Sequence, residues 1–274
     1  MNPFGKWRSA EAEARWRPSA GARPLVYGHR GARHAAPENT LEAFALAREE
    51  GADGVELDVR LTADCEVVVI HDATLTRVTS GRDERRVDAL GVAELQRVEL
   101  DGEARVPTLR QVLELCRDRG LRANVELKSD LRGDGLAQRQ HVTLVKRAAA
   151  VLCAMPEVLP LVICSSFHPA LALGLKWRCA SAGASLPAAW LVHQGQRRSL
   201  RLMLRPSVLR RAGFEAVHPE AALIDAERLA KWRAAQVVVN AWTVNDEAEA
   251  RRLAALGVDG LISDRPGALI RALE

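Results

Sequence analysis

Short β-branched runs alternate with amphipathic stretches from Pro24 onward, and this alternation constrains the fold more than any other feature. We count nine strand-like runs, with helix-like segments between them such as residues 41–50 and 247–256. The runs cover residues 25–29, 54–60, 67–71, 123–128, 161–165, 189–192, 216–218, 237–242 and 260–263. Strands that alternate with helices form a parallel sheet, and a single α/β barrel commonly needs about 250 residues. The sequence therefore predicts an α/β fold of the TIM-type (β/α)8 barrel class.

A closed barrel of this class has eight strand positions, so one of the nine runs must be a hairpin arm or a loop. The sequence does not indicate which run this is. One long connection, residues 73–107 after the third run, lacks the alternation of strand-like and helix-like segments. We expect it to form a lid or a small insertion. Residues 1–23 lack steady periodicity and are expected to form a tail that wraps the domain or is partly disordered. Residues 24–274 would then form a single barrel domain.

The composition is that of a globular protein, with 48% hydrophobic and 27% charged residues. No apolar run approaches the roughly 18 residues of a membrane span, and the start of the chain lacks an apolar segment with a cleavage site. We therefore expect a cytoplasmic protein without stable membrane insertion. The five cysteines lack the spacing of a zinc site, and no basic stripe interleaved with aromatic residues indicates a nucleic-acid partner. The oligomeric state is left open by the sequence.

Two predicted strands carry charged side chains on one face. Side chains two positions apart on a strand point the same way, so Glu56 and Asp58 share a face, and Glu126 and Lys128 share another. Buried charges are costly unless they are paired, and a structural ion pair is the alternative interpretation for Glu126 with Lys128 alone. Taken together, three carboxylates without a cysteine or a strong histidine cluster suit a hard ion with oxygen ligands. We expect one divalent ion, Mg²⁺ or Ca²⁺, with Mn²⁺ as a further candidate.

His29 and His71 each end an apolar run, at the end of the strand where barrel enzymes place their chemistry. Imidazole titrates near neutral pH, so two such side chains on opposite sides of a bound ester can serve as general base and general acid. Arg30 offers a planar fork for phosphate or carboxylate oxygens. The segment Pro37–Thr40 predicts a turn that feeds a helix, with Asn39 or Thr40 as the N-cap, although the motif is equally compatible with a role in chemistry.

These residues resemble the glycerophosphodiester phosphodiesterase family, and the resemblance extends over most of the chain. It rests on motifs that agree in order and context. They are His29–Gly31, Pro37–Thr40, Glu56–Asp58, His71–Asp72, Val106–Leu109, Glu126–Lys128, Ser165–Phe167, Trp242–Val244 and Gly257–Asp264. Two departures are Cys65, where the family usually has glycine, and the poorly matching stretch 170–211. The resemblance implies an α/β barrel that splits a glycerophosphodiester into glycerol 3-phosphate and an alcohol.

The family's functional residues can be carried over by position. Glu56, Asp58 and Glu126 are similar to the ligands of one divalent metal, and His29 and His71 to the acid–base pair. Arg30 and Lys128 then resemble the phosphate contacts. Trp242 resembles a wall of the glycerol pocket, although a core aromatic that closes the barrel is an equal alternative.

Two rival functions are left open. One is a lysophospholipase D-type hydrolase that acts on lipid phosphodiesters, for which the tail and the Arg-rich segment 197–205 would have a purpose. The other is a non-catalytic barrel that binds a phosphorylated ligand. If the chain is a glycerophosphodiester phosphodiesterase, as the resemblance implies, its expected partner is a small-molecule glycerophosphodiester substrate.

Overall fold

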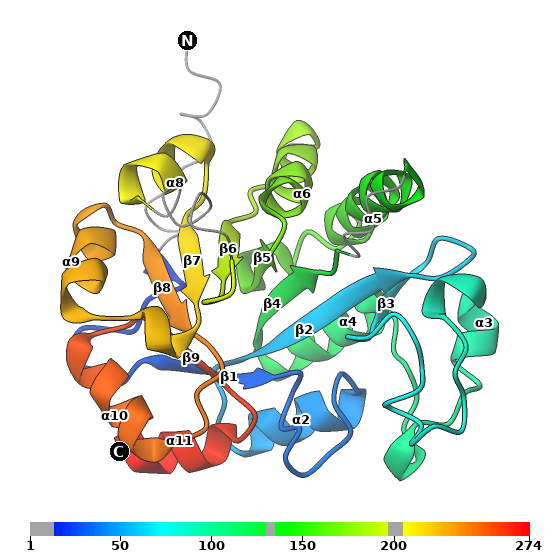
Figure 1. Ribbon diagram of the computed structural model, residues 1–274, viewed down its shortest axis with the longest axis horizontal. Helices are drawn as coiled ribbons and strands as arrows, with labels where there is room; N and C mark the ends of the chain where they lie inside the picture. Colours follow the sequence, from blue (N-terminus) through cyan, green and yellow to red (C-terminus); the bar gives the residue numbers. More distant parts are fainter. Residues whose placement is uncertain (1–13, 130–134, 197–204) are drawn as a thin grey trace.

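Eight parallel strands close into a barrel in the computed structural model, which describes residues 14–129, 135–196 and 205–274 (Figure 1). The strands are β1 (Leu25–His29), β2 (Gly54–Leu61), β4 (Arg122–Leu127), β5 (Val162–Ser166), β6 (Ala188–Val192), β7 (Ala216–Pro219), β8 (Val238–Ala241) and β9 (Gly260–Ser263). Each pairs in parallel with its neighbours, and the pairing of β1 with β2 closes the ring. The predicted barrel is confirmed.

The ninth run is the short strand β3 (Val67–Val69), which lies outside the ring. It pairs antiparallel with the end of β2, with Val69 opposite Val59, and so forms one arm of a hairpin. The prediction ran this strand on to His71, but the observed strand ends two residues earlier. The backbone N–H of Ile70 still donates to the carbonyl of Asp58 in β2 (2.9 Å), whereas the carbonyl of His71 accepts from the side chain of Arg60 (2.7 Å).

Helices follow the strands and cover the outside of the barrel (Figure 1). They are α2 (Leu41–Glu49), α4 (Leu109–Arg119), α5 (Gly135–Cys153), α6 (Pro169–Ser181), α8 (Pro206–Ala212), α9 (Ala226–Ala234), α10 (Glu247–Leu256) and α11 (Pro266–Leu273). Val55, Leu57 and Val59 of β2 belong to the large core cluster between strands and helices. Because neighbouring residues alternate in direction, Glu56 and Asp58 of the same strand point into the barrel.

The segment predicted as an insertion, residues 73–107, follows β3 and contains the short helices η2 (Val87–Ala89), α3 (Val92–Leu95) and η3 (Asp101–Glu103). Its apolar side chains form a separate small core against β3. Members of this core are Val68, Ile70, Leu75, Val87, Leu90, Leu95, Leu100, Ala104 and Val106. The insertion therefore packs as a unit of its own on the outer edge of β2 and β3.

Residues 14–23, within the predicted tail, pack against the amino-terminal end of the barrel. Trp16 is 2% exposed and stacks on Tyr27, with ring centroids 6.4 Å apart. It belongs to a cluster with residues at the beginning of several strands, such as Ala216 and Val238. Arg17 pairs with Asp259 at 2.8 Å. Residues 1–13, including Trp7, lie outside the described part of the chain, and the domain boundary at residue 24 stays a prediction.

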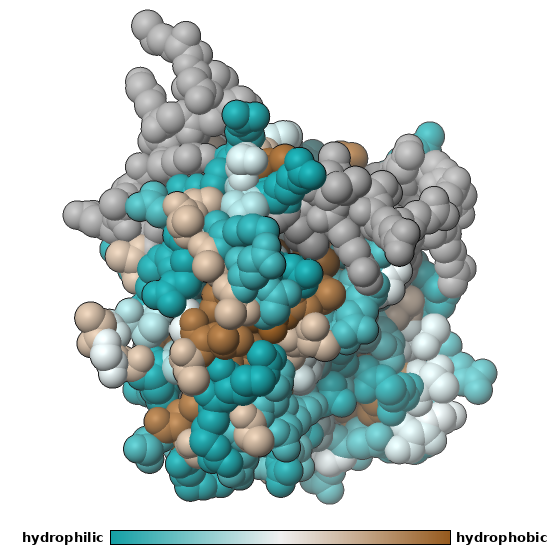
Figure 2. Space-filling view, turned by 60° about the vertical axis from the view of Figure 1, so that its left-hand side comes forward, coloured by the Kyte–Doolittle hydropathy of each residue, from teal (hydrophilic) through white to brown (hydrophobic). Residues whose placement is uncertain are grey.

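Hydrophilic side chains dominate the face shown in Figure 2, and hydrophobic ones gather near its centre. Among the described residues, no helix is long and apolar enough to cross a membrane. The predicted cytoplasmic location stays a prediction. The Arg-rich segment 197–205 lies outside the described residues except for Arg205, the N-cap residue of α8.

Candidate active site

A cavity of about 330 Å³ opens at the carboxyl-terminal end of the barrel strands. Seven of the eight predicted site residues line it. They are His29, Arg30, Glu56, His71, Glu126, Lys128 and Trp242. The eighth, Asp58, is buried beside them, where its Oδ1 lies 3.2 Å from Nζ of Lys128. The structure therefore brings all eight residues together.

Three carboxylates form the base of the site. Asp58 on β2 lies opposite Glu126 on β4 in the strand register, and Glu56 comes two residues before Asp58 on the same face. One oxygen of each carboxylate lies within 4.8 Å of the other two, and all three residues are buried. Carboxylate oxygens at this spacing can hold a single hard cation.

Two cations partly neutralise this cluster. Lys128 donates from Nζ to Oε1 of Glu126 at 2.7 Å, and Arg30 places Nε 3.2 Å from Oδ2 of Asp58. The backbone N–H of Arg30 also donates to Oε2 of Glu56 at 3.2 Å. Three negative charges thus face two positive ones, which leaves the buried cluster with an unbalanced negative charge.

The pKa values of the carboxyls reflect this imbalance. Burial, followed by repulsion from its two acidic neighbours, raises the pKa of Glu56 well above its ordinary value. Burial also raises the pKa of Glu126 to about 7, although Lys128 opposes the rise. Burial would raise the pKa of Asp58 as well, but the charges of Lys128 and Arg30 outweigh it and lower the pKa. Of the three carboxylates, only that of Asp58 has its negative charge fully compensated by Lys128 and Arg30. The three carboxylates together therefore fit a further cation.

His29 is oriented by a carboxylate from the far end of the chain. Its Nδ1 lies 2.6 Å from Oδ1 of Asp264, and its Nε2 lies 3.9 Å from Oε2 of Glu56. Asp264 is itself fixed, because Asn245 donates from Nδ2 to its Oδ2 at 2.7 Å. A carboxylate on one ring nitrogen leaves the other nitrogen to face the carboxylate cluster.

His71 has a similar partner next to it in the chain. Its Nδ1 lies 2.6 Å from Oδ1 of Asp72, whose Oδ2 accepts from Nε of Arg77 at 2.6 Å. Burial lowers the pKa of His71, against the opposing charge of Asp58. The two histidines therefore share one arrangement, an imidazole held at Nδ1 by an aspartate.

The Pro37–Thr40 motif has both a structural role and a place at the site. Thr40 is the N-cap of α2, where its Oγ1 accepts from the backbone N–H of Ala43 at 3.2 Å. Asn39 does not cap the helix. Instead it donates from Nδ2 to Oδ2 of Asp58 at 2.8 Å, and accepts at Oδ1 from the backbone N–H of Asp58. Of the two predicted N-cap candidates, Thr40 therefore caps the helix and Asn39 holds Asp58.

An aromatic wall closes the opposite side of the cavity. Trp242 packs edge-on against Phe167, with ring centroids 5.4 Å apart, and donates from Nε1 to the carbonyl of His218 at 2.8 Å. Leu191 lines the same side. Trp242 also packs against the inner core of the barrel. It therefore lines the cavity and also packs on the barrel core, and its role as a wall of a glycerol pocket stays a prediction.

Several residues at the site were not predicted to act there. Asp264 and Asp72 lie inside motifs that carry the resemblance, but no role was assigned to either. Glu38 and Arg77 were missed as well, and Glu38 stood beside the two capping candidates. Two residues that are two positions apart on a strand can be predicted to point to the same face of the sheet. Contacts between side chains of different loops leave no such signal in the sequence.

The chain matches the model of the "Glycerophosphoryl diester phosphodiesterase family" over residues 29–268. It is 31% identical to a glycerophosphodiester phosphodiesterase of Caldanaerobacter subterraneus over 91% of this chain and 98% of that protein. A solved structure from Silicibacter pomeroyi superimposes with a TM-score of 0.83 at 28% identity, covering 96% of this chain and 97% of that one. A glycerophosphodiester phosphodiesterase from Thermotoga maritima superimposes with a TM-score of 0.71 at 29% identity, covering 91% and 98%.

Proposed function

Because the chain belongs to the glycerophosphoryl diester phosphodiesterase family, we propose that it hydrolyses glycerophosphodiesters to sn-glycerol 3-phosphate and an alcohol by metal-dependent acid–base catalysis. The observation that carries the proposal is the pair of His–Asp contacts beside one carboxylate cluster. His29 and His71 each have Nδ1 held at 2.6 Å by an aspartate, and both line the cavity. Two oriented imidazoles are what general base and general acid catalysis of ester cleavage require.

We assign the divalent ion to Glu56, Asp58 and Glu126. The buried carboxylates and their raised pKa values support this assignment, because an added cation removes the excess negative charge. An all-oxygen donor set favours Mg²⁺ or Ca²⁺, with Mn²⁺ as a further candidate. When bound, the ion supplies Lewis-acid polarisation of a phosphoryl oxygen.

The chain's own cations would bind and orient the phosphate. Arg30 presents a planar guanidinium at the rim of the cluster, and its backbone is fixed with φ of 57° by the hydrogen bonds of the following turn. Lys128 directly follows β4 and contacts Glu126. We assign phosphate contacts to both side chains, which would stabilise negative charge that develops as the P–O bond breaks.

The two histidines would carry the protons. One takes a proton from the attacking hydroxyl, and the other gives a proton to the oxygen of the leaving alcohol. If a hydroxyl of the glycerol attacks first, a cyclic phosphate forms transiently, whereas attack by water gives the products directly. A search for the cyclic phosphate by ³¹P NMR during turnover separates the two routes.

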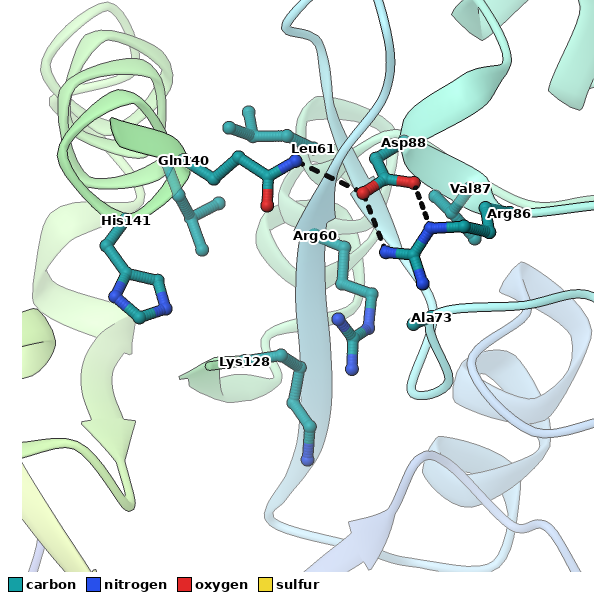
Figure 3. A pocket seen from close by; sticks show the side chains of 10 residues that line it. Arg60, Leu61, Ala73, Arg86, Val87, Asp88, Lys128, Gln140 and His141 are labelled. Atoms are coloured by element: carbon teal, nitrogen blue, oxygen red, sulfur yellow. Dashed lines mark hydrogen bonds and ion pairs between the residues drawn. The ribbon is translucent and has the colours of Figure 1, made fainter. Parts of the chain in front are cut away.

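The two arms of the diester would point in opposite directions. Phe167, Leu191 and Trp242 offer apolar surface for the carbon chain of glycerol. On the other side of Lys128 lies a smaller cavity of about 40 Å³ between the insertion and α5. Figure 3 shows Arg60 and Lys128 extending in the same direction from neighbouring strands at this cavity. Its volume holds roughly three water-sized groups, which suits a small polar alcohol.

The experiment that tests the proposal combines His29→Ala and His71→Ala with a panel of diesters. The purified protein is assayed with Mg²⁺, Ca²⁺ or Mn²⁺, and metal content is measured in each variant. We expect EDTA-sensitive release of glycerol 3-phosphate, lost in both variants at unchanged metal content. Near wild-type turnover in either variant would remove that histidine from the mechanism. A preference for lysophospholipid over glycerophosphocholine would favour a lysophospholipase D-type enzyme, and no hydrolysis of any diester would favour a binding barrel.

A further inference from the structure

Glu38 is the charged residue of the Pro37–Thr40 motif, and its side chain contacts neither the start of α2, which Thr40 caps, nor Asp58, which Asn39 holds. We propose that Glu38 is a positioning residue that couples the two His–Asp pairs to each other and to Arg30. The inference rests on the proposed function and extends it, because it assigns a role to a residue outside the metal, phosphate and proton-transfer groups. Its basis is a set of ion pairs that converge on one carboxylate.

The first arm of this network reaches His71 through the insertion. Arg77 donates from Nη1 and Nη2 to the two oxygens of Glu38, at 2.9 and 2.7 Å. The same guanidinium donates from Nε to Asp72 at 2.6 Å, and Asp72 holds His71. A rigid fork that binds two carboxylates at once fixes their separation, which a lysine ammonium does less well.

The second arm reaches His29 through the loop after β1. Arg33 places Nη1 3.5 Å from Oε2 of Glu38 and Nε 3.5 Å from Oδ1 of Asp264. Asp264 in turn holds His29. These contacts are longer than those of Arg77, so we expect this arm to be the weaker of the two.

The third contact reaches the predicted phosphate site. Arg30 donates from Nη1 to Oε1 of Glu38 at 2.9 Å. Glu38 therefore accepts charge-assisted contacts from three arginines while its side chain is only 9% exposed. Burial alone would raise the pKa of this carboxyl, but Arg77 and Arg30 lower it below its ordinary value, so the carboxylate stays ionised.

The backbone around Glu38 is conformationally restricted, which fixes the position of its carboxylate. Pro37 precedes it with a restricted φ. Asn39 follows in the left-handed region, with φ of 59°, and is tied to Asp58 by two hydrogen bonds. A carboxylate on a fixed backbone can transmit its position to the groups that it holds, whereas one on a mobile loop cannot.

The first experiment compares Glu38→Gln with wild type on an alkyl glycerophosphodiester. Glutamine keeps the shape but loses the charge that attracts three guanidiniums, so we expect kcat to fall about 10- to 100-fold, as for other residues that orient a functional group, and KM to rise through Arg30. Metal affinity is measured by calorimetry and should stay within about threefold, because Glu38 does not contact the carboxylate cluster. Wild-type kcat and KM in the folded variant would overturn the inference.

The second experiment assigns the arms by their leaving-group dependence. A p-nitrophenyl ester releases a weakly basic oxygen that needs no proton, so loss of the general acid should be tolerated on it, whereas loss of the general base should not. The dependence seen for Arg77→Ala should match that of His71→Ala. The dependence for Arg33→Ala should match that of His29→Ala, with a smaller effect. A swapped match, or none, would contradict the network.

The matched control is Arg85→Ala, in the same insertion. The side chain of Arg85 is about as exposed to solvent as that of Arg77, but it pairs with Asp83 and Glu94, away from the cavity. It should leave kcat unchanged. If Arg77 had a purely structural role, Arg77→Ala would lower the melting temperature without altering the leaving-group dependence. That result would overturn the role assigned to Arg77. If wild type itself hydrolyses no diester, the proposed function fails first, which is a distinguishable result.

Discussion

Nδ1 of His29, the last residue of the first barrel strand, lies 2.6 Å from Oδ1 of Asp264, which follows the last barrel strand 235 residues later. Because β1 pairs directly with β9, the ends of the first and last strands meet, and this pairing brings the imidazole and the carboxylate together. The orientation of one predicted proton-transfer group therefore depends on complete folding of the barrel.

The variant Asp264→Asn should lower kcat about 100-fold. An amide at this position no longer selects the same imidazole tautomer, nor does it stabilise a protonated ring, and partners of this kind cost 10- to 100-fold or more. Steady-state kinetics with a glycerophosphodiester provides the measurement. Asp246→Asn is the control, because Asp246 caps α10 and asparagine is an equally good N-cap. Equal activity of both variants would argue against an orienting role for Asp264.

Addition of Mg²⁺ or Ca²⁺ should raise the melting temperature of the protein. Binding to the native state alone stabilises it by about 2.7 kcal/mol at a hundredfold excess over Kd. Glu126→Gln removes one of the three carboxylates and should abolish most of the shift. Glu157→Gln, on an exposed residue far along the chain, should retain it. A metal-induced shift that survives in Glu126→Gln would place the ion elsewhere.

Replacing Trp16 with alanine should destabilise the fold while leaving kcat unchanged. The side chain is 2% exposed and packs at the end of the barrel opposite to the site, where truncation of a large aromatic costs about 3 kcal/mol. Urea unfolding measures the loss. The matched control is Trp177→Ala, since Trp177 is 48% exposed and should change the unfolding free energy by about 0.5 kcal/mol or less. A loss for Trp16→Ala as small as that expected for Trp177→Ala would show that Trp16 does not stabilise the barrel.

His218 should make the protein sensitive to acid. Burial lowers the pKa of this histidine from 6.5 to about 3, and its ring nitrogens contact the amides of Asn124 and Asn240 at 3.3 and 3.1 Å. Only the unfolded state takes up the proton between these values, so the stability is present above pH 6.5 and is lost as the pH falls toward 3. Between pH 7 and pH 5 the loss amounts to roughly 2 kcal/mol.

The measurement is the free energy of unfolding of wild type and His218→Gln at both pH values. Glutamine does not titrate, so the pH-dependent loss should be smaller in the variant by roughly 2 kcal/mol, whatever its absolute stability. The carboxylates contribute equally to both proteins and cancel in the difference. Parallel pH dependences would mean that His218 accepts a proton inside the folded barrel.

The barrel and most of its site residues could be predicted because they follow from local patterns. Alternation of residues along one strand determines that Glu56 and Asp58 point inward, and no distant contact is needed to see it. The identity of the extra strand could not be predicted in this way. Val67–Val69 has the composition of a barrel strand, and only its antiparallel pairing with β2 places it outside the ring.

The groups that orient the site were missed for a related reason. Asp72 is adjacent to His71, but nothing in the sequence shows that its carboxylate turns back toward the ring and also accepts from Arg77. Glu38 and Arg77 lie 39 residues apart, on two loops whose approach depends on how the insertion packs. Interactions between loops are decided by tertiary packing, which periodicity does not report.

The direct pairing of β1 with β2 means that the hydrogen-bonded ring is complete without β3. Residues 73–107 lie outside this ring and pack in a small core of their own, so exchange of this segment between relatives would leave the hydrogen bonds of the barrel intact. Such a graft offers a route to altered leaving-group preference on an unchanged scaffold. It would have to carry an arginine in the place of Arg77, since this guanidinium joins the segment to both Glu38 and Asp72.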